Sequence, residues 1–240
     1  MRMKSAAACL LLAAFAACSR PNFVHYRSPF NDYVARVPWG WNVYTDAQGS
    51  DFAETRFTGP MDRDFLFGLP SFSVKWYRNY RTHVLRDGGA ELYANADDYI
   101  NQTLSQVYDY RYGEDKAVFL MGPDKDSSGQ YRILAKPSDI PSKTHAESGL
   151  PLKMFIIYSP VRVPSNIRWG VDVGPDGKPY NRRMHAYAVI SLPDGFYVLS
   201  YPATKRSFDH DLEAFIDLVS TFHPLTDGPG GKRILIHRAD

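Results

Sequence analysis

The chain has 240 residues, of which 44% are hydrophobic and 22% are charged, a composition that excludes a disordered or collagen-like chain. Lys and Arg number 28 and Asp and Glu number 26, so the formal net charge is +2. Arg2 and Lys4 lie in a leader without acids that we expect to be removed, which leaves 26 basic and 26 acidic residues. A general attraction to nucleic acid or to an anionic membrane is therefore excluded as the main function.

The first 17 residues have the pattern of a signal peptide. Arg2 and Lys4 form a positive start, and 12 consecutive apolar residues follow from Ala6 to Ala17. This run is too short for a membrane-spanning helix, which needs about 20 residues. We therefore assign residues 1–17 to a signal peptide.

The sequence Ala16-Ala17-Cys18 resembles the lipobox of bacterial lipoproteins, although Phe15 stands where that motif usually has Leu. The resemblance implies cleavage before Cys18 and fatty-acyl chains, such as palmitate, on its thiol, which would anchor the protein to a membrane. An ordinary secretory signal followed by a chance cysteine is the alternative. Ser19 then favours the outer membrane of the cell envelope, facing the periplasm, by the sorting rule of enteric bacteria. The other cysteine, Cys9, leaves with the leader, so we expect no disulfide.

The first half of the mature chain alternates between apolar and polar residues. Residues 18–28 are predicted to be a polar tether. Strands are then predicted at 33–37, 42–45 and 71–77. A helix is expected over 95–107, because Asn95 can cap it and Ile100 and Leu104 lie on one apolar face.

The second half predicts more strands and a closing helix. The strands are expected at 116–121, 130–135, 153–163, 184–192 and 196–201. The last two form a hairpin across Pro193-Asp194-Gly195, where the glycine is expected to supply a positive φ. A helix over 208–223 ends before Pro224.

Two polar stretches, 137–151 and 164–183, show no periodicity and are predicted to be surface loops. No composition shift divides the chain, so residues 29–225 are predicted to form a single α+β domain. We expect an antiparallel sheet with helices on its faces, followed by a C-terminal tail at 226–240.

The order of elements resembles the PsbP-like group of the Mog1/PsbP fold. The resemblance rests on the corner Val37-Pro38-Trp39-Gly40-Trp41, the hairpin strand Gly195-Phe-Tyr-Val-Leu-Ser-Tyr-Pro-Ala203 and the helix end Leu218-Val-Ser-Thr-Phe-His-Pro224. It implies an α/β/α sandwich and a non-enzymatic role in binding or assembling larger protein complexes. Some cyanobacterial members of the group are lipoproteins attached to photosystem II. A link of this chain to photosynthesis rests on the resemblance alone.

One segment begins like a calcium-binding loop. Asp124, Asp126 and Ser128 place oxygens at its first, third and fifth positions, and Gly129 is the sixth. An EF-hand needs a Glu at position twelve, which is Ala135 here, so a polar hairpin turn is the alternative. The seven histidines have no zinc-site spacing, and no cofactor is predicted.

The sequence contains no nucleophile motif and no Gly-rich phosphate loop. In the 164–183 stretch, Trp169, Arg182 and Arg183 could instead contact a protein partner, because aromatic and arginine side chains anchor interfaces. A solvated loop is the alternative for the two arginines.

These observations predict a lipid-anchored, non-catalytic binding or assembly module of the bacterial cell envelope. Its expected partners are the membrane, through the Cys18 lipid, and an unidentified envelope protein, with no nucleic acid. An envelope hydrolase with an unrecognised site, or a calcium- or carbohydrate-binding lipoprotein, is the alternative.

Overall fold

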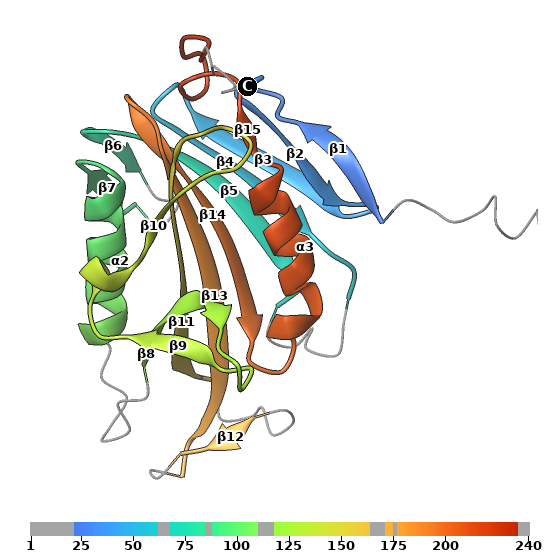
Figure 1. Cartoon of the computed structure of the whole chain (residues 1–240), viewed down its shortest axis with the longest axis vertical. Coiled ribbons are helices and arrows are strands. Elements are labelled where there is room, and N and C mark those ends of the chain that lie inside the picture. Colours follow the sequence, from blue (N-terminus) through green and yellow to red (C-terminus); the bar gives the residue numbers. More distant parts are fainter. Residues whose placement is uncertain are drawn as a thin grey trace, which may run out of the picture.

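The computed structural model describes residues 22–61, 68–84, 88–109, 118–163, 171–174 and 177–234, which form a long twisted sheet between helices (Figure 1). The helices are α2 (Ala96–Asp109), α3 (Phe208–Ser220) and the short 3-10 helix η2 (Pro137–Asp139). The strands are β1 (Phe23–Arg27), β2 (Tyr33–Pro38), β3 (Asn42–Gln48), β4 (Phe52–Thr58), β5 (Ser71–Arg78), β6 (Arg81–Val84), β7 (Ala90–Tyr93), β8 (Phe119–Lys125), β9 (Tyr131–Leu134), β10 (Ser142–Thr144), β11 (Pro151–Arg162), β12 (Asp172–Val173), β13 (Pro179–Ser191), β14 (Gly195–Thr204) and β15 (His223–Pro224). No helix in these ranges is long and apolar enough to cross a membrane.

The main sheet is antiparallel. Over the described residues it has 10 strands, in the order β3-β4-β5-β14-β13-β11-β8-β9, with β10 paired to β11 and β12 paired to β13. A smaller sheet, β1-β2-β15, and the ribbon β6-β7 lie outside it. The prediction of an antiparallel sheet with helices is confirmed, but the fold is more sheet-rich than the balanced α/β/α sandwich that was expected.

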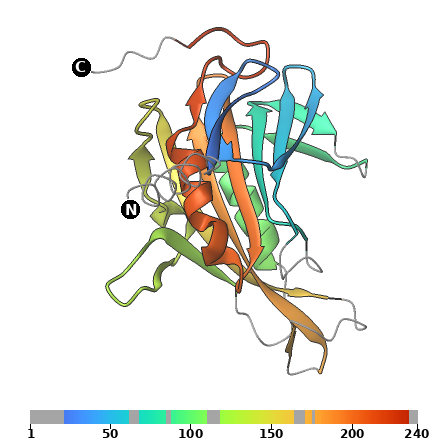
Figure 2. The same ribbon diagram turned by 90° about the vertical axis from the view of Figure 1, so that its right-hand side faces the viewer.

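The two long helices lie on opposite faces of the main sheet (Figures 1 and 2). Helix α3 and strand β2 cover one face, where Phe215 and Tyr33 pack in the larger hydrophobic core. Helix α2 covers the other face, where Ile100 and Leu104 pack in a second core. The apolar stripe that predicted α2 is therefore the side of the helix that the sheet buries.

Strand β14 is apolar on both sides because both faces of the sheet are covered. Tyr197 and Leu199 belong to the core under α3, whereas Phe196 and Val198 belong to the core under α2. The hairpin with β13 is confirmed, with Ser191 opposite Phe196. A continuous apolar run in this sheet thus indicates a strand buried on two sides.

The reason for glycine at position 195 differs from the prediction. Gly195 does not have a positive φ. A Cβ atom there would instead collide with the carbonyl oxygen of Tyr77 and the indole of Trp76. Gly228, at φ +80°, approaches the same indole from the chain that follows β15. Trp76 is 1% exposed, and both glycines are needed so that backbone can lie against it.

Several predicted boundaries are wrong. Part of the expected tether, Phe23–Arg27, is β1 and pairs along its whole length with β2. Helix α3 ends at Ser220 rather than at His223, because His223 and Pro224 pair with β2 as β15. Residues 226–234 of the expected tail fold back instead, with the amide of Ile234 donating to the carbonyl of Leu225 (3.1 Å).

Candidate functional site on the β11–β13 arm

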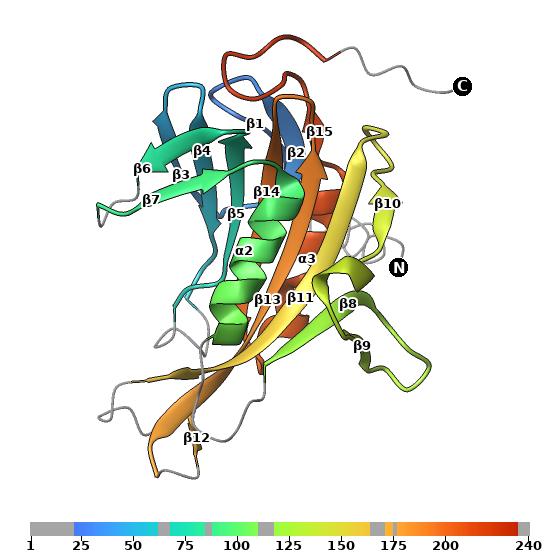
Figure 3. The same cartoon turned by 90° about the vertical axis from the view of Figure 1, so that its left-hand side faces the viewer.

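Strands β11 and β13 continue past the rest of the sheet. They pair from Leu152 opposite Ile190 to Arg162 opposite Tyr180. The pairing of β13 with β14 stops at Arg183, and that of β11 with β8 stops at Tyr158. The end of this ribbon, residues 158–163 and 179–183 with β12 beside it, is called the arm below. Figure 3 shows it extending beyond the body of the domain, away from β1 and β15.

The arm explains an incorrect prediction. The expected loop over 164–183 ends early, because β13 begins at Pro179 and Arg182 and Arg183 are strand residues. Arg182 lies opposite Pro160, and Arg183 lies between Ser159 and Thr204. Neighbouring residues of a strand face opposite sides, so the two arginines cannot share one contact surface.

Arg182 belongs to a cluster of charged and aromatic side chains. Its Nε lies 3.2 Å from a carboxylate oxygen of Asp172, and its Nη2 donates to the hydroxyl of Tyr180 (3.2 Å). Its guanidinium also lies 5.8 Å from the centre of the Tyr180 ring. The side chain remains 43% exposed, so the guanidinium is held in place and still accessible.

A second cation lies beside this cluster. The amide of Lys205 donates to the carbonyl of Arg182 (2.7 Å). The Lys205 ammonium lies 5.7 Å from the ring centre of Tyr158, which in turn packs on Phe119 at 5.8 Å. Of these residue types, Tyr and Arg are enriched among the residues that carry most of the binding energy at protein interfaces.

Arg183 lies on the other face of the arm, with Asn181 and His185. Its Nε atom is buried without a hydrogen-bond partner among the described residues. Burial lowers the pKa of Arg183. Arg182 is thus paired and accessible, whereas Arg183 is partly buried and its Nε is unpaired.

The possible calcium ligands hold parts of the chain together instead. Asp124 pairs with Lys143, across 3.0 Å. One oxygen of Asp126 accepts hydrogen bonds from the amide (2.8 Å) and the hydroxyl (2.6 Å) of Ser128 and from the amide of Gln130 (3.0 Å). These hydrogen bonds lower the pKa of Asp126, and the bond from the Ser128 hydroxyl has the largest effect. Such bonds are typical of a side chain that closes its own turn. Within the described residues, no three His, Cys, Asp or Glu side chains are grouped to hold a metal ion.

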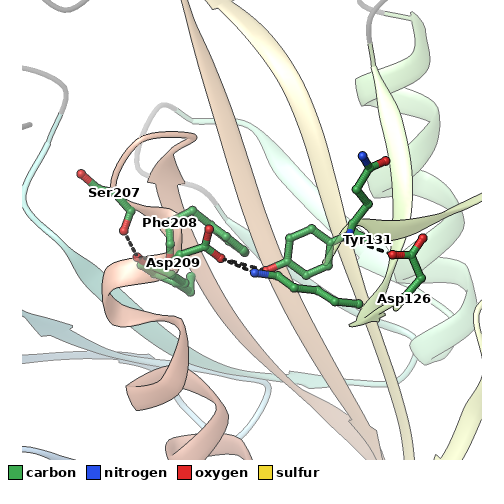
Figure 4. A network of polar contacts seen from close by, with 8 residues as sticks. Asp126, Tyr131, Ser207, Phe208 and Asp209 are labelled. Atoms are coloured by element: carbon green, nitrogen blue, oxygen red, sulfur yellow. Dashed lines mark hydrogen bonds and ion pairs between the residues drawn. The ribbon is translucent and has the colours of Figure 1, made fainter. Parts of the chain in front are cut away.

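The β8–β9 hairpin is tied to the start of α3 (Figure 4). Lys125 lies 2.9 Å from a carboxylate oxygen of Asp209, and the hydroxyl of Tyr131 donates to the same oxygen (3.2 Å). The Lys125 ammonium is 4.8 Å from the centre of the Tyr131 ring. Sequence reasoning missed this contact because 84 residues separate Lys125 from Asp209. It fixes the hairpin beside the helix.

An acid–base pair, His83 and Glu91, lies away from the arm. His83 Nε2 is 2.9 Å from a Glu91 oxygen, and the contact lowers the pKa of Glu91. The His83 ring stacks on Phe52 at 4.5 Å and meets Tyr77 edge-on at 5.0 Å. His83 is only 3% exposed, so this imidazole joins the β6–β7 ribbon to the sheet.

Two predicted site residues, Cys18 and Trp169, lie outside the described residues. Their predicted roles in lipid anchoring and partner binding stay predictions.

No protein-family model and no curated protein matches the chain. Among solved structures, it is similar to the solution structure of cyanobacterial PsbP (CyanoP) from Synechocystis sp. PCC 6803, with 14% identity over 86% of this chain and 95% of that one and a TM-score of 0.42. It is also similar to a crystal structure from Bacteroides thetaiotaomicron VPI-5482, with 11% identity over 85% of this chain and a TM-score of 0.37. That match covers 49% of the Bacteroides chain, so this chain spans about half its length.

Proposed function

We propose that this protein is a lipid-anchored, non-catalytic binding or assembly module of the bacterial cell envelope, and that the arm is its contact surface for a protein partner. The observation that carries the proposal is the continuation of β11 and β13 past β14 and β8. A strand pair that β14 and β8 no longer flank gains little from the core of its own domain. Its accessible arginine and aromatic side chains are the residue types that anchor protein interfaces.

The electrostatics of the arm support a protein partner. The Arg182 and Lys205 cations stand beside Tyr158 and Tyr180, and Asp172 compensates only part of this charge. The mature chain has equal numbers of basic and acidic residues, so its net charge does not attract a partner. A local cationic and aromatic surface would instead select a partner that carries complementary charges at the matching places.

The absence of catalysis is part of the proposal. The His83–Glu91 pair would be the natural acid and base of a hydrolase, but aromatic rings enclose its imidazole in the core. A general base needs hydrogen-bond reach to a substrate, and a side chain packed in this way does not offer it.

Membrane attachment is tested by Cys18→Ser. The native protein is expected to incorporate labelled palmitate in growing cells, and Cys18→Ser is expected to incorporate none. A Cys18→Ser protein that is still labelled, or a native protein that is not, would contradict lipid anchoring at this residue.

Partner binding is tested by chemical crosslinking of the native protein in its own membranes. One recurring envelope complex is expected, and Arg182→Ala should remove it without loss of folded protein. The matched control is Lys143→Ala, which removes an exposed cation on β10. A complex that survives Arg182→Ala, or no complex at all, would contradict the proposal.

A further inference from the structure

The start of the described chain lies against an exposed tryptophan. The amide of Trp39, in the turn between β2 and β3, donates to the carbonyl of Asn22 (3.0 Å), and Phe23 pairs with Pro38 beside it. Trp39 is 44% exposed. Asn22 is the first described residue, so the segment that precedes it starts at the Trp39 turn.

The length of that segment limits how far the turn can be from a lipid anchor. Cys18, the proposed attachment residue, comes four residues before Asn22. A fully extended chain covers at most about 3.6 Å per residue, so the two Cα atoms lie within about 14 Å of each other. Acyl chains on Cys18 would hold it at the bilayer surface. The anchor would therefore keep the Trp39 side of the domain next to the membrane.

The described chain around this turn is apolar. Asn42 of β3, Thr58 of β4 and Ser71 of β5 lie in one row across the sheet, so the chain beside them is at one end of it. The described residues of this end, 38–43, 57–61 and 68–72, contain no charged side chain and are called the apolar end below. Residues 62–67, which include three charged side chains, lie outside the described residues. The large apolar side chains that the apolar end exposes are Trp39 (44%), Val43 (47%), Met61 (71%) and Leu69 (42%).

The second tryptophan of the turn, Trp41, packs inward. Its ring lies on Phe72 at 4.6 Å, and a Cβ atom at Gly59 would come within 2.8 Å of its indole. Trp41 thus fixes the turn that presents Trp39 at the surface. Tryptophan is enriched at membrane–water interfaces, because its ring is largely apolar and its N–H needs a polar partner.

We propose that the apolar end is a membrane contact, whose exposed side chains enter the headgroup layer of the bilayer that holds the Cys18 lipid. The occupant is a lipid surface, because the short reach from Cys18 brings this end to the membrane and uncharged apolar side chains suit its interface. The inference rests on the proposed function, since the lipid on Cys18 supplies the anchor. Several acyl chains already retain a protein, so the contact sets the orientation of the domain.

The contact leaves the arm available to a partner. Strands β1 and β2 lie at the right-hand side of the domain in Figure 1, and β12 lies at its lower end. When these two strands face the viewer in Figure 2, the arm still extends downward. The arm therefore projects sideways from the membrane contact, where a partner in the same membrane can reach it.

The test uses the mature chain coupled through Cys18, its single cysteine, to a maleimide-bearing lipid in phosphatidylcholine vesicles. Phosphatidylcholine with brominated acyl chains quenches the fluorescence of tryptophans that reach the bilayer. The native chain should be quenched, and Trp39→Phe should lose at least half of that quenching. The control Trp169→Phe also removes one of the four tryptophans and should keep the quenching. No quenching of the native chain, or an equal loss in both variants, would overturn the inference.

A matched pair of charge substitutions tests the surface beside Trp39. Val43→Glu and Val84→Glu make the same change at similar exposures, 47% and 56%. Val84 bonds to Gln48, at the other end of β3 from the apolar end. A carboxylate is costly to bring into apolar surroundings, so Val43→Glu should reduce the quenching at least twofold and Val84→Glu should leave it unchanged. Equal quenching in the two variants would overturn the inference.

Palmitate labelling in cells reads the proposed anchoring separately, because the vesicle experiment supplies its own lipid. A labelled Cys18 without bromolipid quenching would overturn only the membrane contact. Quenching without any palmitate label would overturn lipid anchoring, and with it the contact in cells.

Discussion

Acid should weaken the fold through His185. Burial, and next the charge of Arg183, lower its pKa to about 4 in the folded chain, against 6.5 for a free histidine. Between these values the unfolded chain binds a proton that the folded chain excludes. Stability is therefore complete above pH 6.5 and falls as the pH decreases toward 4. Applied at pH 5, this difference gives a loss of about 2 kcal/mol relative to pH 8.

The assay is urea unfolding at pH 8 and pH 5, for the native chain and for His185→Phe. Phenylalanine keeps a ring and cannot bind the proton. Other groups also respond to acid, because burial lowers the pKa of His145 as well. The informative quantity is therefore how much more stability the native chain loses than the variant. About 2 kcal/mol is expected for this difference.

A difference near zero would refute the reasoning. It would mean that the folded chain protonates His185 as readily as the unfolded chain does, and that the imidazole is solvated. A larger acid loss in His185→Phe than in the native chain would refute the sign of the argument.

Two further predictions concern side chains that hold the fold together. Gly228 and Gly129 have nearly the same positive φ, at +80° and +79°, but only Gly228→Ala places a Cβ against Trp76. Urea unfolding should therefore find Gly228→Ala less stable than Gly129→Ala by about 1–3 kcal/mol. Equal losses of stability would show that the Trp76 indole moves aside to make room for the methyl group. Glu91→Gln should lower stability at pH 7 by removing the His83 contact. Because that contact lowers the pKa of Glu91 from 4.5, the difference should shrink as the pH falls below 4.5 and through the lowered pKa, and a difference that stays constant with falling pH would contradict this account.

The sequence predicted the elements whose pattern is local. Helix α2 follows from its cap and apolar stripe, and β14 follows from a dense apolar run beside a short turn. In contrast, His223 of β15 was predicted as the last helical residue because the apolar stripe of the helix continues to Phe222, and its pairing with Val34 makes it a strand residue instead. Strand β1 was missed because its five residues, in a polar context, show too little alternation of apolar and polar side chains.

The site was harder to predict because it depends on strand register. The polar start of β13 reads as a loop, and it becomes a strand through pairing with β11, about 20 residues earlier in the chain. Arg182 and Arg183 were both selected as contact residues, but adjacent positions on a strand lie on opposite faces. Asn181 and His185 carry no motif, and only the extent of β13 shows that they face the same side of the sheet as Arg183.

Site-specific photocrosslinking in native membranes tests the central claim, that the arm contacts a protein partner. Replacing Val173 on β12 with p-benzoyl-phenylalanine places the probe on the arm, at a position that is 70% exposed. The matched control is Tyr80, which is 73% exposed and lies outside the arm, in the turn between β5 and β6. We predict one recurring envelope protein crosslinked from position 173, none from position 80, and loss of the adduct in Arg182→Ala. The same adducts from both positions, or none from position 173, would contradict the account.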